Sequence, residues 1–519
     1  MPVRMTGLVS NMDTESIIKS LMSVQRTKQT KIENKITKLE WKQEVWKSLN
    51  TKAYSFYTDA LSKFRLQSSF ATKKVSSSDE SVATVIASNT AAEGTHSLKV
   101  SQLASSQFVT SGELKNDDNS LAVSTSTKLV DLGMSTGSTI TVKLGDDATG
   151  RTLEVKEETT ITDFLSTLKE AGLSASYDTA QNRFFISSKQ SGVDNAFTLT
   201  TTDTNKLAGL KLSEITKDTT SSDGTMVYDS ALMNLTQAKN SKYNYNGVEF
   251  TSSSNNISIN GLSITLKGLT DGANTTDNSN DDVPISLSVT NDTQAVYDMV
   301  KSFITTYNSL LKEMNTYYYS ESASSFNPLT DDEKESMSDD EIEKWETKIK
   351  DSLLRRDSTL GTLITAMRSN LNSNVTVGGK SYSLASYGIA TSMDYTEKGL
   401  LHIDGNKDDS TTSSKTDKLL AALKEDPDTV ATVLTQLAGN LYKQLGENMG
   451  GTKLRSALTF YNDKEMKNTL TDYNEELDKM EDKLQDMEDR YYAQFSAMET
   501  ALAKMNSQSS SLASMLGNK

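Results

Sequence analysis

The sequence predicts an α+β multidomain protein. Terminal helices are expected to form a coiled-coil leg, next to a helical domain, with nested β-rich head domains in the middle. The chain has 519 residues, whereas an ordinary domain has roughly 100 to 200. Both ends repeat apolar residues with the helical period, and the middle alternates apolar and polar residues over short runs. Chain length and these two patterns together predict the fold class.

The C-terminal segment carries the clearest coiled-coil pattern. From Leu470 onward, apolar residues recur in steps of three and four, as in the core of a heptad repeat. The predicted core residues are Leu477, Met480, Leu484, Met487, Tyr491, Phe495, Met498, Leu502 and Met505. Two successive four-residue steps around Tyr491 form a stutter, which locally unwinds a supercoil. A helix of this length, roughly 50 Å at about 1.5 Å per residue, requires a partner.

The N-terminal segment is the expected partner of that helix. The apolar members of its seven-residue repeat are Ile18, Ile32, Leu39 and Trp46. Polar Gln25 interrupts this repeat, and Leu21 and Leu49 lie three residues after two of its positions. Asp13 or Thr14 is expected to cap the start of the helix. Because the apolar seam is patchy, we predict weak self-association and pairing with the C-terminal helix of the same molecule or a neighbour.

The middle of the chain predicts strands. Between about Val82 and Val289, runs such as HSLKVSQLA, STITVKLG and NISINGLSITLKGL alternate apolar and polar residues and are separated by Gly, Asn, Asp and Ser. Within them, TITDFLSTLKEAGLSASYDTAQNRFFISS indicates a helix followed by a hairpin. This small α+β unit is therefore expected to be inserted between two flanking sets of strands.

The helical period returns at Thr293 and continues toward the C-terminal helix. Pro427 is expected in the first turn of one of these helices, with Asp426 as its cap. The predicted domains are a terminal leg (1–45 and 446–519), a mainly helical domain (46–85 and 291–445), a β-rich head domain (86–122 and 223–290) and an inserted variable α+β head domain (123–222).

Composition excludes several partners. The formal net charge is -15, so nucleic acid and anionic membrane surfaces would repel the chain. No stretch approaches the roughly 18 apolar residues of a membrane span, and the N-terminus lacks the apolar core of a cleavable secretory signal. The chain has no cysteine, which excludes disulfides and thiolate metal sites. We therefore expect no nucleic acid partner and no membrane insertion.

Three short motifs imitate catalytic or ligand sites without completing them. GMSTG, at residues 133–137, matches G-x-S-x-G, but a predicted strand follows it where a nucleophile elbow needs a helix. NVTVGGKS has Asn374 in place of the first glycine of a P-loop. HIDGNKDDSTTSSK has Asp409 where an EF-hand loop needs glycine. With His96 and His402 the only histidines, we predict no enzyme and no catalytic, cofactor or metal site.

Several segments resemble one known family. The opening GLVSNMDTESIIKSLM is similar to the N-terminal signature of the flagellar filament cap family (FliD, hook-associated protein 2), with Asn11 and Met12 where that pattern has Gly-Leu. Six further segments resemble the family in its own order, among them AAEGTHSLKVSQLASSQ, YGIATSMDYTEKGLLHID and YYAQFSAMETALAKMNSQSSSLASMLG. The resemblance covers nearly the whole chain, except about residues 123–222, which are similar to a variable outer insertion.

The resemblance implies a non-enzymatic role at the distal tip of a bacterial flagellum. A family member would form a homo-oligomeric ring, with a pentamer expected, that promotes folding and insertion of exported flagellin. It would be extracellular, secreted without a cleavable signal peptide by the flagellar type III export apparatus with an export chaperone, and placed near hook–filament junction proteins. Adhesion to host or mucin surfaces would be a second activity. The alternatives are a surface adhesin or a hook–filament junction protein without a capping role.

Overall fold

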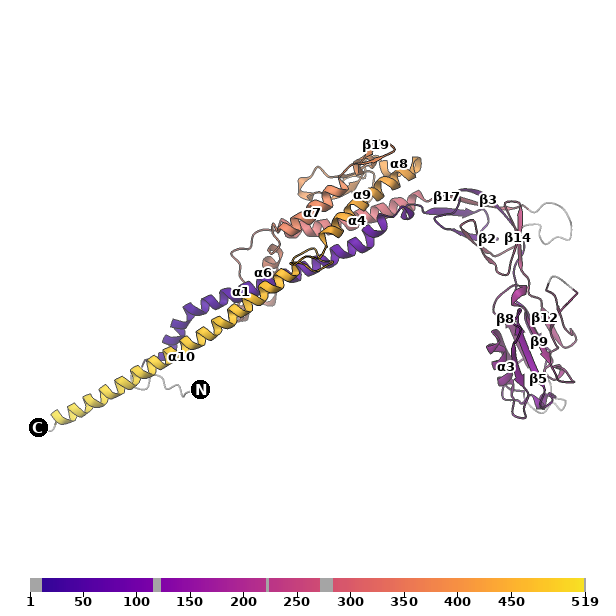
Figure 1. Cartoon of the computed structure of the whole chain (residues 1–519), viewed down its shortest axis with the longest axis horizontal. Coiled ribbons are helices and arrows are strands. Elements are labelled where there is room, and N and C mark those ends of the chain that lie inside the picture. Colours follow the sequence, from indigo (N-terminus) through magenta and orange to yellow (C-terminus); the bar gives the residue numbers. More distant parts are fainter. Residues whose placement is uncertain (1–11, 115–122, 221–223, 271–282, 518–519) are drawn as a thin grey trace. The chain divides into compact units, whose positions relative to one another are not determined.

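The computed structural model describes residues 12–114, 123–220, 224–270 and 283–517. The chain divides into two compact units, of which the first combines Met1–Phe70 with Thr293–Lys519 and the second is Ala71–Asp292. The first unit is mainly helical and contains both terminal helices, whereas the second is built mainly from strands (Figure 1). The predicted α+β multidomain class, with terminal helices and β-rich domains, is confirmed.

The change from helix to strand occurs earlier than the sequence pattern suggested. Residues 46–85 were expected in the helical domain, but strand β1 (Lys73–Ser77) pairs with β17 (Ile285–Asn291) in the second unit. The segment KKVSS has Val75 as its single apolar residue, so it carries little alternation. Its strand conformation comes from pairing with a distant segment. The four-domain division itself stays a prediction.

Long helices build the first unit. Terminal helix α1 (Thr14–Ser55) runs into a π-helical turn, η1 (Phe56–Leu61), and the short α2 (Ser62–Phe64). The remaining helices are α4 (Thr293–Tyr318), α5 (Asp331–Glu335), α6 (Asp339–Ser352), α7 (Ser358–Leu371), α8 (Lys418–Glu425), α9 (Pro427–Asn448) and α10 (Asp463–Leu516). Two hairpins lie between α7 and α8, formed by β18 (Val375–Val377) with β19 (Lys380–Tyr382) and by β20 (Ile389–Thr391) with β21 (Leu401–Ile403).

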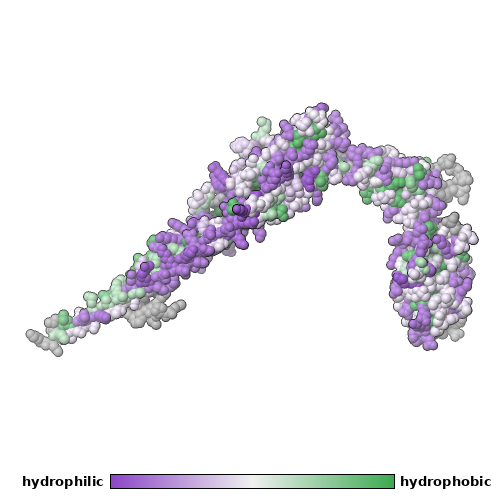
Figure 2. Space-filling view, viewed as in Figure 1, coloured by the Kyte–Doolittle hydropathy of each residue, from purple (hydrophilic) through white to green (hydrophobic). Residues whose placement is uncertain are grey.

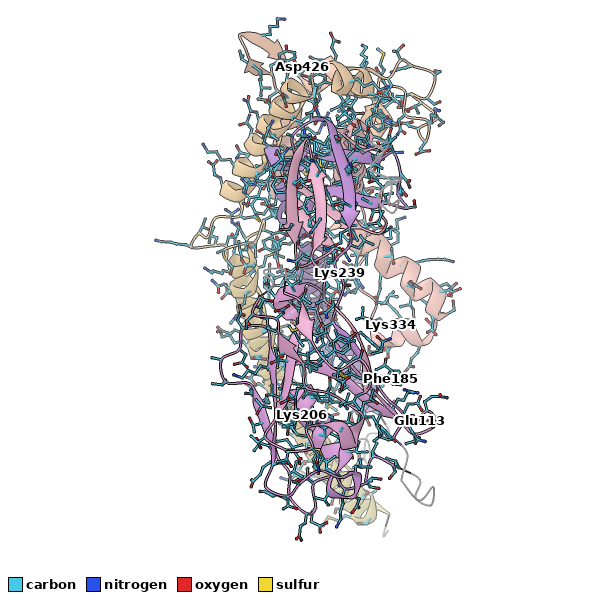
Figure 3. All side chains as sticks on the ribbon, turned by 90° about the vertical axis from the view of Figure 1, so that its right-hand side faces the viewer. Glu113, Phe185, Lys206, Lys239, Lys334 and Asp426 are labelled. Carbon is cyan, nitrogen blue, oxygen red and sulfur yellow. The ribbon has the colours of Figure 1, made fainter. Side chains whose placement is uncertain are left out.

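Local sequence signals explain where several of these helices begin. The Asp13 carboxylate accepts a hydrogen bond from the Ser16 N–H at 3.0 Å, which caps α1. Asp426, labelled in Figure 3, accepts from the Thr429 N–H at 3.1 Å, and Pro427 follows in the first turn of α9. Both caps agree with the sequence prediction.

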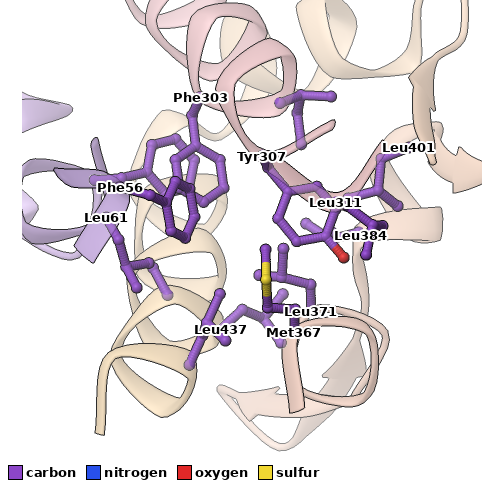
Figure 4. Packing of buried hydrophobic residues seen from close by; sticks show 14 of the residues in the cluster. Phe56, Leu61, Phe303, Tyr307, Leu311, Met367, Leu371, Leu384, Leu401 and Leu437 are labelled. Atoms are coloured by element: carbon purple, nitrogen blue, oxygen red, sulfur yellow. The ribbon is translucent and has the colours of Figure 1, made fainter. Parts of the chain in front are cut away.

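One continuous core holds the body of the first unit together. It contains apolar side chains from α1, η1, α4, α7 and α9 and from both hairpins. Figure 4 shows part of it, with labelled residues from η1, α4, α7, α9 and β21. Phe64 stacks on Phe303 with ring centroids 3.9 Å apart, and Tyr307 and Met367 are fully buried beside them. Aromatic pairs of this kind add to the stability that burial of apolar surface provides. The core therefore makes a rigid platform from which the terminal helices extend.

Within its described residues, the second unit contains four main sheets. A five-stranded sheet has the order β1, β17, β3 (Gly94–Gln102), β13 (Ser241–Tyr245) and β14 (Val248–Ser252), beside a three-stranded sheet of β15 (Asn256–Ile259), β16 (Leu262–Leu266) and β2 (Ala83–Ala87). The third sheet has four strands in the order β12 (Met233–Thr236), β4 (Phe108–Ser111), β8 (Arg183–Ser188) and β7 (Leu173–Asp178). The fourth has three strands in the order β6 (Arg151–Glu154), β5 (Thr139–Leu144) and β9 (Phe197–Thr201). A two-stranded ribbon joins β10 (Thr216–Lys217) and β11 (Met226–Val227).

Two separate hydrophobic cores show that one set of strands is nested in another. One core draws residues from both flanks of the unit, including Leu98 and Leu287, and the second draws only on residues between Val109 and Ala238. Helix α3 (Ile161–Glu170) covers the second core with Phe164, and a capping box formed by Thr160 and Asp163 starts it. Figure 3 labels several side chains of this unit, among them Phe185 on β8 and Lys206, which pairs with Glu214 at 3.2 Å.

Candidate functional site

The paired terminal helices α1 and α10 form the candidate site. They run side by side in opposite directions (Figure 1). Four contacts define the register of the pair. At the inner end, the Trp46 ring stacks on that of Tyr461, just before α10, with centroids 5.4 Å apart, and Lys35 Nζ lies 5.2 Å from the centroid of the Tyr473 ring. Farther out, Gln29 donates a hydrogen bond to Glu481 at 3.3 Å, and Arg26 forms an ion pair with Glu488 at 3.4 Å. Residues nearer the start of α1 contact residues nearer the end of α10. The two ends of one chain therefore form an antiparallel helix pair.

A small apolar cluster holds the outer part of this pair, and we name it the leg cluster. Its buried members are Ile18, Met22 and Leu484. Partly buried side chains from α10 surround them, namely Met480, Met487, Tyr491, Tyr492 and Phe495. The cluster is far smaller than the core of the helical body, and Gln25 and Gln29 follow it along the α1 seam. The helices are therefore held more weakly here than at the body.

The structure distributes the predicted seam residues over three environments. Ile18, Met480, Leu484, Met487, Tyr491 and Phe495 belong to the leg cluster. Trp46 belongs to the core of the helical body. Ile32 is buried, Leu39, Leu477, Met498 and Leu502 are half-buried, and Met505 is 64% exposed. The coiled-coil assignment of these residues as a set stays a prediction.

One flanking position differs from the sequence interpretation. Leu21, three residues after Ile18, is 44% exposed, whereas Met22, four residues after it, is 1% exposed. A heptad seam requires alternating steps of three and four, and the next seam position after Met22 is Gln25. The seam of α1 therefore begins with a four-residue step from Ile18 to Met22. The sequence pattern did not reveal this step, because the next seam position, Gln25, is polar.

The C-terminal end of α10 exposes apolar side chains. Leu512 and Met515 are 62% and 80% exposed, and Met505 precedes them. Figure 2 shows hydrophobic atoms near this end of the helix. Helix α10 continues without a break through the predicted stutter to Leu516. Within the described residues, α1 begins at Thr14 and the leg cluster reaches no further than Phe495, so the last turns of α10 extend past that cluster.

Polar contacts attach the inner part of α1 to the helical body. Lys42 pairs with Asp357 at 2.8 Å, and the Asn50 side chain accepts from the Phe460 N–H at 2.8 Å. The ammonium group of Lys38 donates to the Phe326 carbonyl at 2.9 Å, and burial lowers the pKa of Lys38. These contacts attach α1 to the helical body over this stretch.

A second feature of the helical body escaped the sequence interpretation. His402 on β21 lies between two carboxylates, with Nδ1 2.5 Å from Asp409 Oδ2 and Nε2 2.9 Å from Glu397 Oε2. Burial by itself lowers the pKa of His402, but hydrogen bonds to Asp409 and Glu397 outweigh it and raise that pKa above its ordinary value. Spacings of five and seven residues in a loop carry no recognisable motif, so nothing in the sequence indicated this clamp.

The imitated motifs occupy turns. Gly378 and Gly379 form the two-residue turn between β18 and β19, and residues 133–137 lead from a short 3-10 helix into β5.

Across the part of the chain that the structure describes, no cluster of His, Asp and Glu is arranged to hold a metal ion. No helix in that part is long and apolar enough to cross a membrane.

Comparison with family models gives matches at both ends of the chain. A model described as the flagellar hook-associated protein 2 C-terminus matches residues 238–507, and one described as the N-terminus of the same protein matches residues 10–107. The two matches include most of the residues of α1 and α10.

Individual relatives extend over nearly the whole chain. The flagellar hook-associated protein 2 of Halalkalibacterium halodurans is 26% identical, with 98% of this chain and 99% of the relative covered. That of Escherichia coli strain K12 is 27% identical, with 99% and 97% covered. The crystal structure of the D1-D2-D3 domains of the Escherichia coli flagellar cap protein FliD has a TM-score of 0.54 at 21% identity, and covers 82% of this chain and 99% of that one. This last similarity shows a shared fold.

Proposed function

The chain belongs to the flagellar hook-associated protein 2 family, and on this premise we propose that it caps the distal end of a bacterial flagellar filament. The observation that carries the proposal is the match of this family over residues 10–107 and 238–507, which include α1 and most of α10, the two helices of the antiparallel pair. The protein acts as an assembly factor and performs no chemical step.

The proposed mechanism is geometric. Copies of the chain form a ring, expected to be a pentamer, and the ring shelters each arriving flagellin while it folds and inserts. Burial of apolar flagellin surface supplies the driving force for insertion. The small leg cluster and the polar seam residues Gln25 and Gln29 support exchange of helix partners at low cost as the ring moves. The exposed apolar end of α10 is available for such partners.

The proposed route and surroundings follow from the same premise. The chain leaves the cell through the flagellar type III export apparatus with an export chaperone and without a cleavable signal peptide. At the filament tip it contacts flagellin, and before the filament grows it sits on hook–filament junction proteins. Adhesion to host or mucin surfaces is proposed as an additional activity of the second unit.

Deletion of the gene in the source bacterium tests the capping role. We expect cells without filaments and with unpolymerised flagellin in the medium, and we expect the full chain to restore filaments when it is supplied again. The matched control is Lys483→Asp, a change at an exposed position of α10 next to the leg cluster, which is expected to restore filaments fully. Filaments of normal length on the deletion strain would refute the proposal.

A further inference from the structure

Two tight turns in the second unit have the same sequence, Asn-Gly. Asn246 and Gly247 connect β13 to β14, and Asn260 and Gly261 connect β15 to β16. No other asparagine in the chain is followed by glycine. The φ angles are 51° and 49° at the asparagines and 87° and 76° at the glycines, as two-residue hairpin turns of type I′ require. The two turns therefore form a matched pair within one molecule.

An Asn-Gly pair deamidates without an enzyme when its reacting groups are free. The amide nitrogen of the glycine attacks Cγ of the asparagine, the Cγ–Nδ2 bond breaks, and ammonia leaves with the proton that the attacking nitrogen gives up. The product is a cyclic succinimide, which water opens at either carbonyl to give aspartate or isoaspartate. Glycine favours the attack because it has no Cβ beside its nitrogen. The reaction therefore requires a free glycine N–H and an asparagine amide that is free to turn toward it.

Hydrogen bonds restrain both reacting groups at the β13–β14 turn. The Asn246 Oδ1 accepts from the Ser97 N–H at 2.8 Å, and Nδ2 lies 3.2 Å from His96 Nδ1. The Asn246 N–H also donates to the Ser97 carbonyl at 2.9 Å. The attacking nitrogen is engaged as well, because the Gly247 N–H donates to Asn244 Oδ1 at 2.8 Å. The amide and the nucleophile of this turn thus already have partners.

The β15–β16 turn has neither restraint. Among the described residues, the Asn260 side chain has no hydrogen-bond partner and the Gly261 N–H donates to no acceptor. Asn260 is exposed, so water reaches its amide. A neighbouring segment holds only the other side of the glycine, where the Gly261 carbonyl accepts from the Ser88 N–H at 2.8 Å. The attacking nitrogen and the carbon that it attacks are therefore free.

We propose that Asn260 is a site of spontaneous deamidation in the folded protein and that Asn246 is protected. The modified chain carries aspartate or isoaspartate at position 260, and the isoaspartate form is a substrate for enzymes that methylate isoaspartyl carboxylates. The chemistry needs only the two residues of the turn and water, so it is independent of the proposed function.

Isoaspartate does not fit the native turn. It carries the main chain through Cβ, so the turn gains an extra backbone carbon, whereas a two-residue turn fixes the register of its hairpin. Ile257 and Ile264, which face each other across β15 and β16, are buried and depend on that register. The turn also lies against another segment, because a Cβ on Gly261 would stand only 2.8 Å from Ala91 Cα. Conversion to isoaspartate therefore loosens the hairpin.

Ageing of the folded full chain at mildly alkaline pH, followed by digestion and mass spectrometry, measures both sites in one sample. The matched control is the same chain in concentrated denaturant, where both Asn-Gly pairs are free and are expected to react at similar rates. In the folded chain we expect Asn260 to deamidate about tenfold or more faster than Asn246, because several hydrogen bonds must first break at Asn246. An isoaspartyl methyltransferase with a labelled methyl donor then shows how much of the modified peptide is isoaspartate.

Two variants test the cause and the consequence. Asn244→Ala removes the acceptor of the Gly247 N–H, so we expect deamidation at Asn246 to rise several-fold, with circular dichroism as the check of the fold. Asn260→Gly keeps a residue that suits the turn and removes the reacting amide. Hydrogen exchange over residues 256–266 is therefore expected to speed up with age in the wild-type chain and to stay constant in Asn260→Gly. Ser263→Ala, at an exposed position of the same hairpin, is the control and should age like the wild type.

Three results would overturn the proposal. The first is an Asn260 that stays intact in the folded chain over the time in which the denatured chain is converted. The second is an equal rate of deamidation at the two asparagines of the folded chain. The third is an aged Asn260→Gly chain whose hairpin exchanges as fast as that of the aged wild type. An unchanged rate at Asn246 in the Asn244→Ala chain would overturn the hydrogen-bond explanation of its protection.

Discussion

At the scale of single residues, His402 makes the stability of one loop depend on pH. Both ring nitrogens can donate to Asp409 and Glu397 only when the imidazole is protonated. Hydrogen bonds from Thr411 and His402 outweigh the effect of burial and lower the pKa of Asp409 to about 2. The Asp409 carboxylate therefore stays charged at neutral pH, and the protonation of His402 decides whether the clamp is closed.

We expect the clamp to stabilise the helical unit most in mild acid. The folded-state pKa of His402 is raised above 6.5, so its contribution is complete below that value and disappears as the pH rises through the folded-state pKa. His402→Gln should cost about 2 kcal/mol at pH 6 and progressively less above neutrality. The measurement is the free energy of unfolding against pH, with His96→Gln as the control. An equal cost at every pH would refute the clamp.

Trp46 is the residue at which the leg joins the body. Trp46→Ala removes its stacking on Tyr461 and leaves a cavity in the core, so we expect the helical unit to lose about 3–5 kcal/mol. Denaturant unfolding followed by fluorescence measures this unit alone, because Trp41, Trp46 and Trp345 all belong to it. Trp41→Ala, at a half-buried position, should cost about 1 kcal/mol. Equal losses of unfolding free energy in the Trp46→Ala and Trp41→Ala variants would contradict the placement of Trp46 at the junction of leg and body.

At the scale of elements, the sequence predicted periodic helices well and irregular ones poorly. The long helix α10 and the caps Asp13 and Asp426 follow from local rules. The π turn η1 has no sequence signature, since FYTDAL continues the helical period of α1. Strand β1 was missed because its partner β17 lies more than two hundred residues away. Local sequence patterns predict the helices and strands that form from the preferences of their own residues. Elements that form only through contacts with distant segments are not predicted by such patterns.

The pairing of α1 with α10 predicts a local response to mutation. Leu484→Asp places a charge in the leg cluster, so opening of residues 14–30 should become easier by about 2 kcal/mol, while the body stays intact. Hydrogen exchange over residues 14–30 measures the opening, and fluorescence reports the body. Lys483→Asp, on the neighbouring exposed position, is the control. Unchanged exchange in the Leu484 variant would show that the helices do not pair in solution.

At the scale of the whole molecule, the second unit is an insertion with adjacent ends. The Asp292 N–H donates to the Thr72 carbonyl at 2.9 Å, so the chain enters and leaves this unit at one place. Each hydrophobic core draws its residues from one unit alone. The sequence predicted the nesting of the strands from their alternation, and it could not fix the boundary at Phe70 because that boundary depends on the β1–β17 pairing.

Replacing residues 73–291 with a short glycine linker should leave the helical unit folded. Because each unit has its own core, we expect the free energy of unfolding of the first unit to change by less than about 0.5 kcal/mol. Tryptophan fluorescence measures it, and the isolated segment 71–292 should show its own cooperative transition by circular dichroism. A large loss of stability in the first unit would show that the two units fold as one.

The central claim is that copies of this chain form the ring of a filament cap. The size and shape of the purified full chain, measured by light scattering and negative-stain imaging at several concentrations, test it most directly. We predict a concentration-dependent closed ring from which the paired α1 and α10 helices project. A monomer at every concentration, or a two-fold dimer that grows no further, would contradict the claim.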